Sequence, residues 1–309
     1  MNQTDNPEWM KLVIPDERSE DDRFAAVVKT LAVSDLLNGL SGWESAVLKS
    51  HKTADHILHQ AVFLTDIGLS VAVPEIKDLM DSVLQHVSSE GILQTRIQIQ
   101  AAYGGKGGPD WHWMLCDAPL VYTLALQSGA LSVGQAAEGI TFLVNLHKED
   151  GWPCRIDPLL GKFRGPGKAS DICPFATLLM LKLMSLDPRY QNHEVTRQAG
   201  EGLLSLWDQR KVHKPYLFAM GTDFQKLKAP LIWYDLLHFL EVMTRFKWTR
   251  STQQIQEITA ILRAKQDANG QFTPESIYRP WADWEFGQKK EPSVWITYLA
   301  QRILSRMDE

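Results

Sequence analysis

The three cysteines are the residues whose type and position most directly point to chemistry. Cys116, Cys154 and Cys173 each lie at a turn that contains glycine or proline, or at the expected start of a helix. Three thiolates with one imidazole or carboxylate would suit tetrahedral zinc. The intervals between them are not those of a zinc finger, and a free cysteine is commonly a small buried apolar residue. A zinc site at one rim of the fold and ordinary packing are therefore both open.

Two aspartates beside these cysteines are the candidate acid and base residues. Asp117 follows Cys116 directly, and Asp171 lies two positions before Cys173. Apolar surroundings can raise the pKa of a carboxyl group into the range that proton transfer requires. His112 would share a helical face with Cys116, although prolines on both sides argue against a helix there. A structural role for Asp117, with bonds to neighbouring backbone, is the alternative.

Tryptophans are numerous, with 11 in 309 residues. Aromatic rings stabilise cations by about 0.5–2 kcal/mol each, and they also pack against apolar molecules and sugars. Four of them are expected to contact a ligand, namely Trp113, Trp152, Trp233 and Trp284. The alternative for each is that the indole fills space between helices.

A basic, glycine-rich segment over residues 161–168 contributes Arg164 to the expected ligand site. The backbone N–H groups and cationic side chains of such a loop can hold a phosphate or diphosphate. The segment lacks the Walker A spacing, and a solvated loop is the alternative. A different hypothesis uses Asp235 and Glu285 with tryptophan platforms as a carbohydrate-active site.

Helical periodicity dominates the segments that must position these side chains. Apolar residues recur at spacings of three and four over residues 74–86, 133–146, 177–186, 195–207, 231–246, 252–262 and 293–307. Convincing strand alternation is nearly absent. We therefore expect an all-α chain of roughly ten helices, with boundaries uncertain by a few residues.

A glycine turn recurs where helices are expected to end. Gly91, Gly151 and Gly270 each follow a helix and precede a residue that is apolar or lies next to one. Glycine takes the left-handed cap conformation without steric cost. The second interval is nearly twice the first, and such regularity indicates stacked helical hairpins. The long period leaves room for hairpins arranged in a ring around a cavity, whereas chance placement of the glycines is the alternative.

Helical hairpins, glycine turns and late aromatic residues together resemble the terpenoid cyclase and protein prenyltransferase superfamily of α/α toroids. The stretch from Gln266 through Gly270 to Phe272 is similar to the Q-x-x-x-G-x-W repeat of squalene cyclases. The acidic motif of squalene–hopene cyclases and the metal motifs of terpene synthases are absent. In detail the chain looks most like uncharacterised bacterial members of this group, so the resemblance implies an α/α toroid fold but no particular activity.

The resemblance also implies a fourth zinc ligand. Protein prenyltransferases bind zinc through an Asp-x-Cys motif and a later histidine. Asp171-Ile172-Cys173 looks like that motif, and His238 follows within an expected helix. The chain departs from the family pattern after Cys173, where Pro174 and Phe175 follow, and the family's second subunit is lacking.

Composition limits the remaining possibilities. The formal net charge is −5 and 44% of the residues are hydrophobic, which is typical of a globular protein and argues against a dedicated nucleic-acid binder. The polar start lacks the features of a signal peptide, and no apolar run is long enough for a transmembrane segment. We expect a cytoplasmic protein with an irregular arm over residues 1–22 and a single domain over residues 23–309.

The expected function is the binding or conversion of an apolar small molecule, with isoprenoids among the candidates, in an aromatic-lined central cavity. A zinc site at the rim belongs to this hypothesis, and an enzyme of this kind would be a transferase or cyclase. Two alternatives stay open. One is the carbohydrate-active enzyme, and the other is a helical-repeat scaffold that binds a protein without catalysis.

Overall fold

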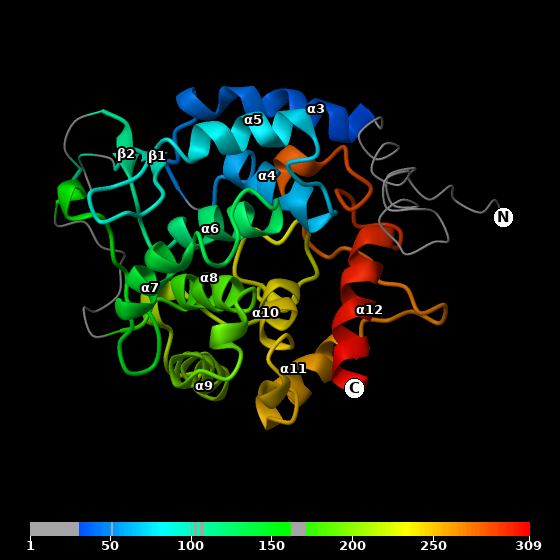
Figure 1. Cartoon of the computed structure of the whole chain (residues 1–309). Helices are drawn as coiled ribbons and strands as arrows, with labels where there is room; N and C mark the ends of the chain where they lie inside the picture. The colour runs from blue at the N-terminus through cyan, green and yellow to red at the C-terminus, as the bar shows by residue number, and fades with distance from the viewer. Residues whose placement is uncertain (1–30, 51, 100, 102–103, 106–107, 162–170) are drawn as a thin grey trace.

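The structure, a computed structural model, describes residues 31–50, 52–99, 101, 104–105, 108–161 and 171–309. This part of the chain is mainly helical, with ten α-helices and a two-stranded sheet (Figure 1). The expectation of a mainly helical protein is thus confirmed. The arm expected over residues 1–22 lies outside the described residues.

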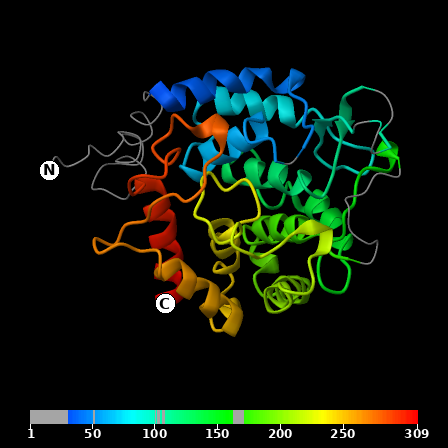
Figure 2. The same cartoon turned by 180° about the vertical axis from the view of Figure 1, so that it is seen from behind.

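Five helices, called here the core helices, follow one another in contact. They are α4 (Ile57–Asp66), α6 (Ala118–Gln127), α8 (Pro174–Met184), α10 (Leu236–Met243) and α12 (Val294–Asp308). Each of them packs against the next in this order. The last also meets the first, because the ring of Phe63 in α4 lies 5.9 Å from the ring of Trp295 in α12. Figure 1 and Figure 2 show this succession from the front and from behind.

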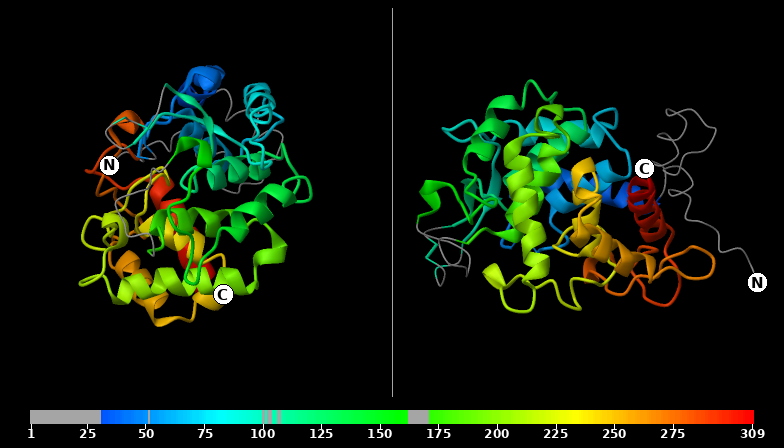
Figure 3. Two further views of the ribbon diagram at one scale, coloured as in Figure 1. Left: turned by 90° about the vertical axis from the view of Figure 1, so that its left-hand side faces the viewer. Right: turned by 90° about the horizontal axis from the view of Figure 1, so that it is seen from below.

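The other helices cover this set. They are α3 (Leu31–Gly39), α5 (Pro74–Val83), α7 (Ala137–Asn145), α9 (Glu194–Asp208) and α11 (Gln253–Arg263). α7 packs on α6, α9 on α8, and α11 on both α10 and α9. Seen from below in Figure 3, α9 and α11 are nearest to the viewer, on the outside of α8 and α10.

Burial on one face gives a helix a clear period, whereas burial on all faces hides it in α4 and α6; the core helices α8, α10 and α12 still overlap expected helical segments. α5 buries one face, formed by Ile76, Leu79, Met80 and Val83, and exposes the other, so its periodicity is clear. Every residue of α8 is buried, and α6 is buried from its first residue to Ala125. A helix that is packed on all sides has no polar stripe, and for this reason α4 and α6 do not stand out in the sequence.

The glycine turns adopt the expected backbone. Gly91, Gly151 and Gly270 have positive φ angles of 79°, 144° and 79°. A Cβ atom at Gly151 would lie 2.7 Å from Oγ1 of Thr177 in α8. That hydroxyl accepts the N–H of Trp152 at 3.0 Å, so the turn is seated directly on α8.

Two local expectations are corrected. The helix expected over residues 231–246 starts only at Leu236, because Asp235 caps it and the segment before it is not helical. His112 does not share a helix with Cys116, since β2 (Asp110–His112) pairs antiparallel with β1 (Thr95–Ile97). Among the described residues, none of the helices has the length and apolar character needed to cross a membrane.

Candidate functional site

The segments that precede the core helices contact one another. Lys52, shortly before α4, places its Nζ 4.4 Å from the ring centre of Trp233, shortly before α10. Trp281, before α12, donates its indole N–H to the carbonyl of Ala54 at 2.8 Å. Residues that are far apart in sequence therefore meet where the core helices begin, and most of the candidate residues lie there.

The structure brings the segments of the three cysteines together. The N–H of Leu115 donates to the carbonyl of Arg155 at 3.0 Å, and the N–H of Cys173 donates to the carbonyl of Trp152 at 2.7 Å. Burial raises the pKa of Cys116 well above its usual value, and the charges of Asp117, Cys154 and Cys173 raise this pKa further. Such an effect requires the three sulfur atoms to share one neighbourhood. Cys116 and Cys154 are partly exposed, whereas Cys173 is buried.

The fourth zinc ligand implied by the resemblance lies in different surroundings. Nδ1 of His238 is 2.9 Å from the carbonyl oxygen of Trp233, which can only accept, so Nδ1 carries the hydrogen. Burial and the positive charge of Lys182 lower the pKa of His238 to about 3. A metal ion at Nε2 would be repelled by the same charge.

Burial raises the pKa of Cys173 to about 12, so this thiol is protonated at neutral pH. Within the described ranges, no three side chains of His, Cys, Asp or Glu are arranged to hold a metal ion. The zinc site therefore stays a prediction, and no step of the function proposed below is assigned to a metal.

Asp117 is a buried helix cap. Its carboxylate accepts hydrogen bonds from Oγ1 of Thr95 and from the N–H groups of Met114 and Ala118, the latter two at 2.8 Å. Burial raises the pKa of Asp117 to about 6 in spite of these donors. Because three donors engage the carboxylate, its contacts support the structural role that the sequence left open.

Two other predicted polar groups lie near the thiols. Burial raises the pKa of the Tyr216 phenol, and the charges of Cys154, Cys173 and Asp171 raise it further. Asp171 and two of the cysteines therefore lie near Tyr216. Nδ1 of His112 lies 3.1 Å from Oδ2 of the buried Asp157. His112 thus pairs with a carboxylate and not with Cys116.

Asp235 differs from Asp117 in having an oxygen without a partner. Oδ1 caps α10 by accepting the N–H of His238 at 3.0 Å, whereas Oδ2 is buried and accepts no hydrogen bond from the part of the chain that the structure describes. Burial raises the pKa of Asp235 to about 7, although the nearby Lys228 acts in the opposite direction. Its charge also raises the pKa of Tyr278, whose hydroxyl accepts the N–H of Trp233 at 3.0 Å. A carboxyl group that is partly protonated near neutral pH thus lies beside an aromatic group.

Three further aromatic rings, called here the ring group, lie together in this region and belong to Trp233, Phe218 and Phe175. The Trp233 ring lies 5.1 Å from that of Phe218 at an angle of 25°, and 4.7 Å from that of Phe175. Trp233 and Phe218 are only partly buried. Such a surface can pack against an apolar molecule and stabilise a positive charge on it.

Two lysines lie over aromatic rings at this site. Nζ of Lys228 lies 3.8 Å from the Tyr278 ring centre, and Lys52 lies over Trp233. Burial lowers the pKa of Lys228, and repulsion by Lys226 and Lys52 lowers it further. The nearby carboxylates of Asp235 and Asp223 act in the opposite direction, and Asp223 pairs with Lys226 at 2.9 Å. The cationic groups of Lys52 and Lys228 can attract an anionic group on a bound molecule.

The other predicted aromatic residues pack inside the fold. Trp152 is fully buried and donates its indole N–H to the carbonyl of Leu143 at 2.8 Å. Trp113 lies edge-on to Phe142 at 5.7 Å. Trp284 packs on Phe63 at 5.1 Å. Arg164 lies outside the described residues.

Glu285 of the carbohydrate hypothesis is engaged at the start of α12. It accepts hydrogen bonds from the hydroxyl of Ser293 at 2.8 Å and from the N–H groups of Val294 and Trp295 at 3.1 and 3.0 Å. Burial raises the pKa of Glu285. Its contacts are those of a helix cap and do not pair it with Asp235.

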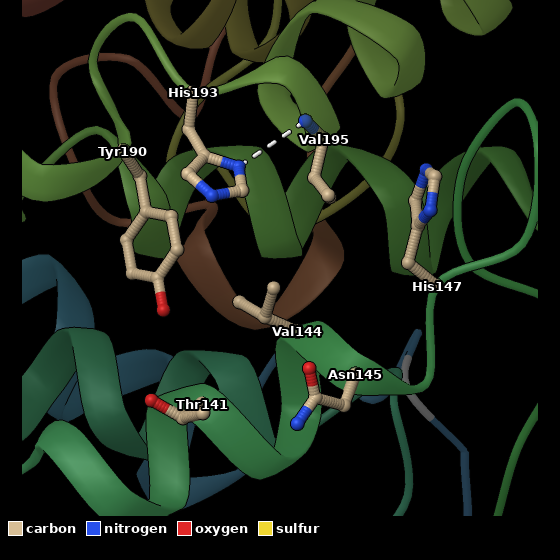
Figure 4. Close-up of a pocket in the computed structure, with 7 residues that line it drawn as sticks. All are labelled: Thr141, Val144, Asn145, His147, Tyr190, His193 and Val195. Carbon is tan, nitrogen blue, oxygen red and sulfur yellow. Dashed lines mark hydrogen bonds between the residues drawn. The ribbon is translucent and has the colours of Figure 1, made fainter.

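A separate cavity of about 360 Å³ lies between α7 and the start of α9 (Figure 4). Its lining consists of Thr141, Val144, Asn145, His147, Tyr190, His193 and Val195. Nδ1 of His193 accepts the N–H of Val195 at 3.2 Å. None of the predicted site residues belongs to this lining, which carries no acidic side chain, lysine or arginine.

Sequence analysis missed Tyr278, Tyr216, Lys52 and Lys228. Their places at the site depend on contacts between distant segments, and no local motif marks them. The only sequence signal nearby is the Trp233-Tyr234-Asp235 run before a helical pattern.

No protein-family model, curated protein or solved structure matches this chain significantly. The function is therefore argued from the geometry of the site.

Proposed function

We propose that this chain is an α/α toroid that binds and converts an apolar small molecule where its core helices begin. The single observation that carries the proposal is Asp235, a buried carboxyl group that has one oxygen without a hydrogen bond from the described residues and lies near Tyr278, whose hydroxyl accepts the N–H of Trp233. Isoprenoids are among the candidate molecules.

Contacts at the other end of the core helices support the toroid. Gln127 of α6 places Nε2 3.4 Å from Asp66 of α4, which also lies 3.7 Å from Nζ of Lys182 in α8. Glu241 of α10 pairs with Arg306 of α12 at 3.0 Å. One polar cluster thus draws on all five core helices, as a ring closed around a centre requires.

In the proposed reaction, Oδ2 of Asp235 gives its proton to a double bond of the bound molecule. With a pKa of about 7, a substantial fraction of the carboxyl groups holds this proton at neutral pH. The cation that forms on the substrate would face the ring group, and each aromatic ring stabilises a cation by about 0.5–2 kcal/mol. Lys228 stabilises the carboxylate that remains.

The lysines narrow the class of substrate. Lys52 and Lys228 would attract an anionic head group while the apolar part lies on the ring group. We therefore favour an apolar molecule with an anionic group over a neutral sugar. A carbohydrate-active site would use Glu285 as its second carboxylate, and Glu285 would have to leave its position as a helix cap.

The test uses farnesol and farnesyl phosphate with the full chain. Binding is followed by tryptophan fluorescence, and products are identified by gas chromatography with mass spectrometry. We expect tighter binding of the phosphate, and at least a tenfold slower conversion in Asp235→Asn with binding retained. Asp117→Asn is the matched control, because it alters another buried cap whose oxygens are already engaged.

Two results would contradict the proposal. One is that neither compound binds, and the other is that Asp235→Asn converts the substrate as fast as the wild type. If Asp117→Asn abolished conversion of the substrate and Asp235→Asn did not, Asp117 and not Asp235 would be the proton donor.

A further inference from the structure

Cys116 and Cys154 lie on two segments that run antiparallel. Met114 and Ile156 form an antiparallel pair, and the N–H of Asp157 donates to the carbonyl of Trp113 at 2.8 Å. In an antiparallel pairing, moving two residues forward on one segment and two residues back on the other leads to the next pair on the same face. The two residues of that pair lie opposite each other. Cys116 and Cys154 are those positions, at the point where the first segment turns into α6.

The electrostatics agree with this placement. The charge of Cys154 is among the causes that raise the pKa of Cys116, after burial and the adjacent Asp117. Disulfides need Cα atoms about 4.4–6.8 Å apart, a range that opposite residues of antiparallel segments reach.

Exposure separates these two cysteines from the third. Cys116 and Cys154 are both partly exposed residues, nearer to the surface than Cys173. Cys173 is buried at the start of α8, where its N–H is bonded to the carbonyl of Trp152.

We propose that Cys116 and Cys154 are a redox-sensitive pair that forms an intramolecular disulfide on exposure to a low-molecular-weight disulfide such as oxidised glutathione. This inference goes beyond the proposed function and does not depend on it.

The exchange balances in two steps. The Cys154 thiolate attacks one sulfur of oxidised glutathione, the glutathione S–S bond breaks, and one glutathione leaves and takes up a proton. The Cys116 thiolate then attacks the mixed disulfide at Sγ of Cys154 and displaces the second glutathione. Two protein thiols are oxidised and one disulfide is reduced to two thiols. Because burial raises the pKa of Cys116 well above its usual value, the second step is slow near neutral pH and faster in alkaline buffer.

The disulfide would join the turn before α6 to the segment after Gly151. Asp117, the cap of α6, follows Cys116 directly, so the bond fixes the backbone that presents this carboxylate. By restricting the unfolded chain it is expected to raise Tm by roughly 5 °C.

The test treats the folded full chain with oxidised glutathione at alkaline pH. Free thiols are counted after unfolding, and peptides are mapped by mass spectrometry without reduction. We expect the free thiols to fall from three to one, with a Cys116–Cys154 cross-linked peptide in a monomer. Cys173→Ser is the matched control and should form the same cross-link.

Cys116→Ser and Cys154→Ser should each lose the cross-link and carry a glutathione adduct on the remaining thiol of the pair. Circular dichroism of each variant confirms that it is folded. A Cys154–Cys173 cross-link, a cross-link between two chains, or three unchanged thiols after prolonged treatment would overturn the proposal.

Discussion

Replacing Asp235 with asparagine should change how stability depends on pH. Asp235 has a folded-state pKa of about 7, whereas the unfolded value is 3.8. Between these values the folded state binds more protons than the unfolded state, so the contribution of Asp235 to stability is fully present below about pH 4 and falls as the pH rises through 7. Asparagine keeps the oxygen that accepts the N–H of His238 but cannot ionise. The stability of the variant therefore does not fall with rising pH on account of this residue.

The size of the effect follows from the shift. One pKa unit corresponds to about 1.4 kcal/mol, and the shift is about three units, so the loss reaches about 4 kcal/mol above pH 7. The two proteins should therefore be similarly stable near pH 4, within about 1 kcal/mol. Near pH 8 the variant should be more stable by up to about 4 kcal/mol.

The assay is urea unfolding of wild type and Asp235→Asn at several pH values between 4 and 8. Other titrating groups, His56 and Asp117 among them, are common to both proteins and cancel in the difference. A stability difference that stays constant with pH, or that favours the wild type as the pH rises, would refute the burial argument. It would also remove the protonated carboxyl group on which the proposed reaction depends.

Three further outcomes are expected. Burial alone would raise the pKa of Glu241, yet the charges of three arginines lower it to about 2. The contribution of Glu241 to folding stability is therefore present above about pH 4.5 and is lost as the pH falls. Glu241→Gln should lower the free energy of unfolding by about 3 kcal/mol at pH 7 and by little at pH 2, as measured by urea unfolding. Gly151→Ala should destabilise the fold by about 1–3 kcal/mol in thermal unfolding, because φ is 144° and the methyl group would meet Thr177; an unchanged Tm would show that the turn adapts. The double variant Lys52→Ala, Lys228→Ala should raise the Kd for farnesyl phosphate by about tenfold and leave that for farnesol nearly unchanged, and equal effects on both ligands would count against an anionic head group.

Four covering helices, α5, α7, α9 and α11, and the glycine turns were predictable from the sequence. α5, α9 and α11 bury one face, and one-sided burial produces a helical period that can be counted without a structure. The glycines at 91, 151 and 270 have the backbone that only glycine takes up freely.

The residues that form the site were decided by the tertiary structure. Trp152 and Trp233 have the same side chain, yet Trp152 is fully buried and bonded to the carbonyl of Leu143, whereas Trp233 is partly exposed and lies under Lys52. Asp117 and Asp235 both cap a helix, and only the second has an oxygen without a donor. Local sequence sets helical faces and turns because these depend on neighbours along the chain. Burial, pKa and free hydrogen-bonding groups depend on segments far away in sequence, and these meet only when the core helices pack together.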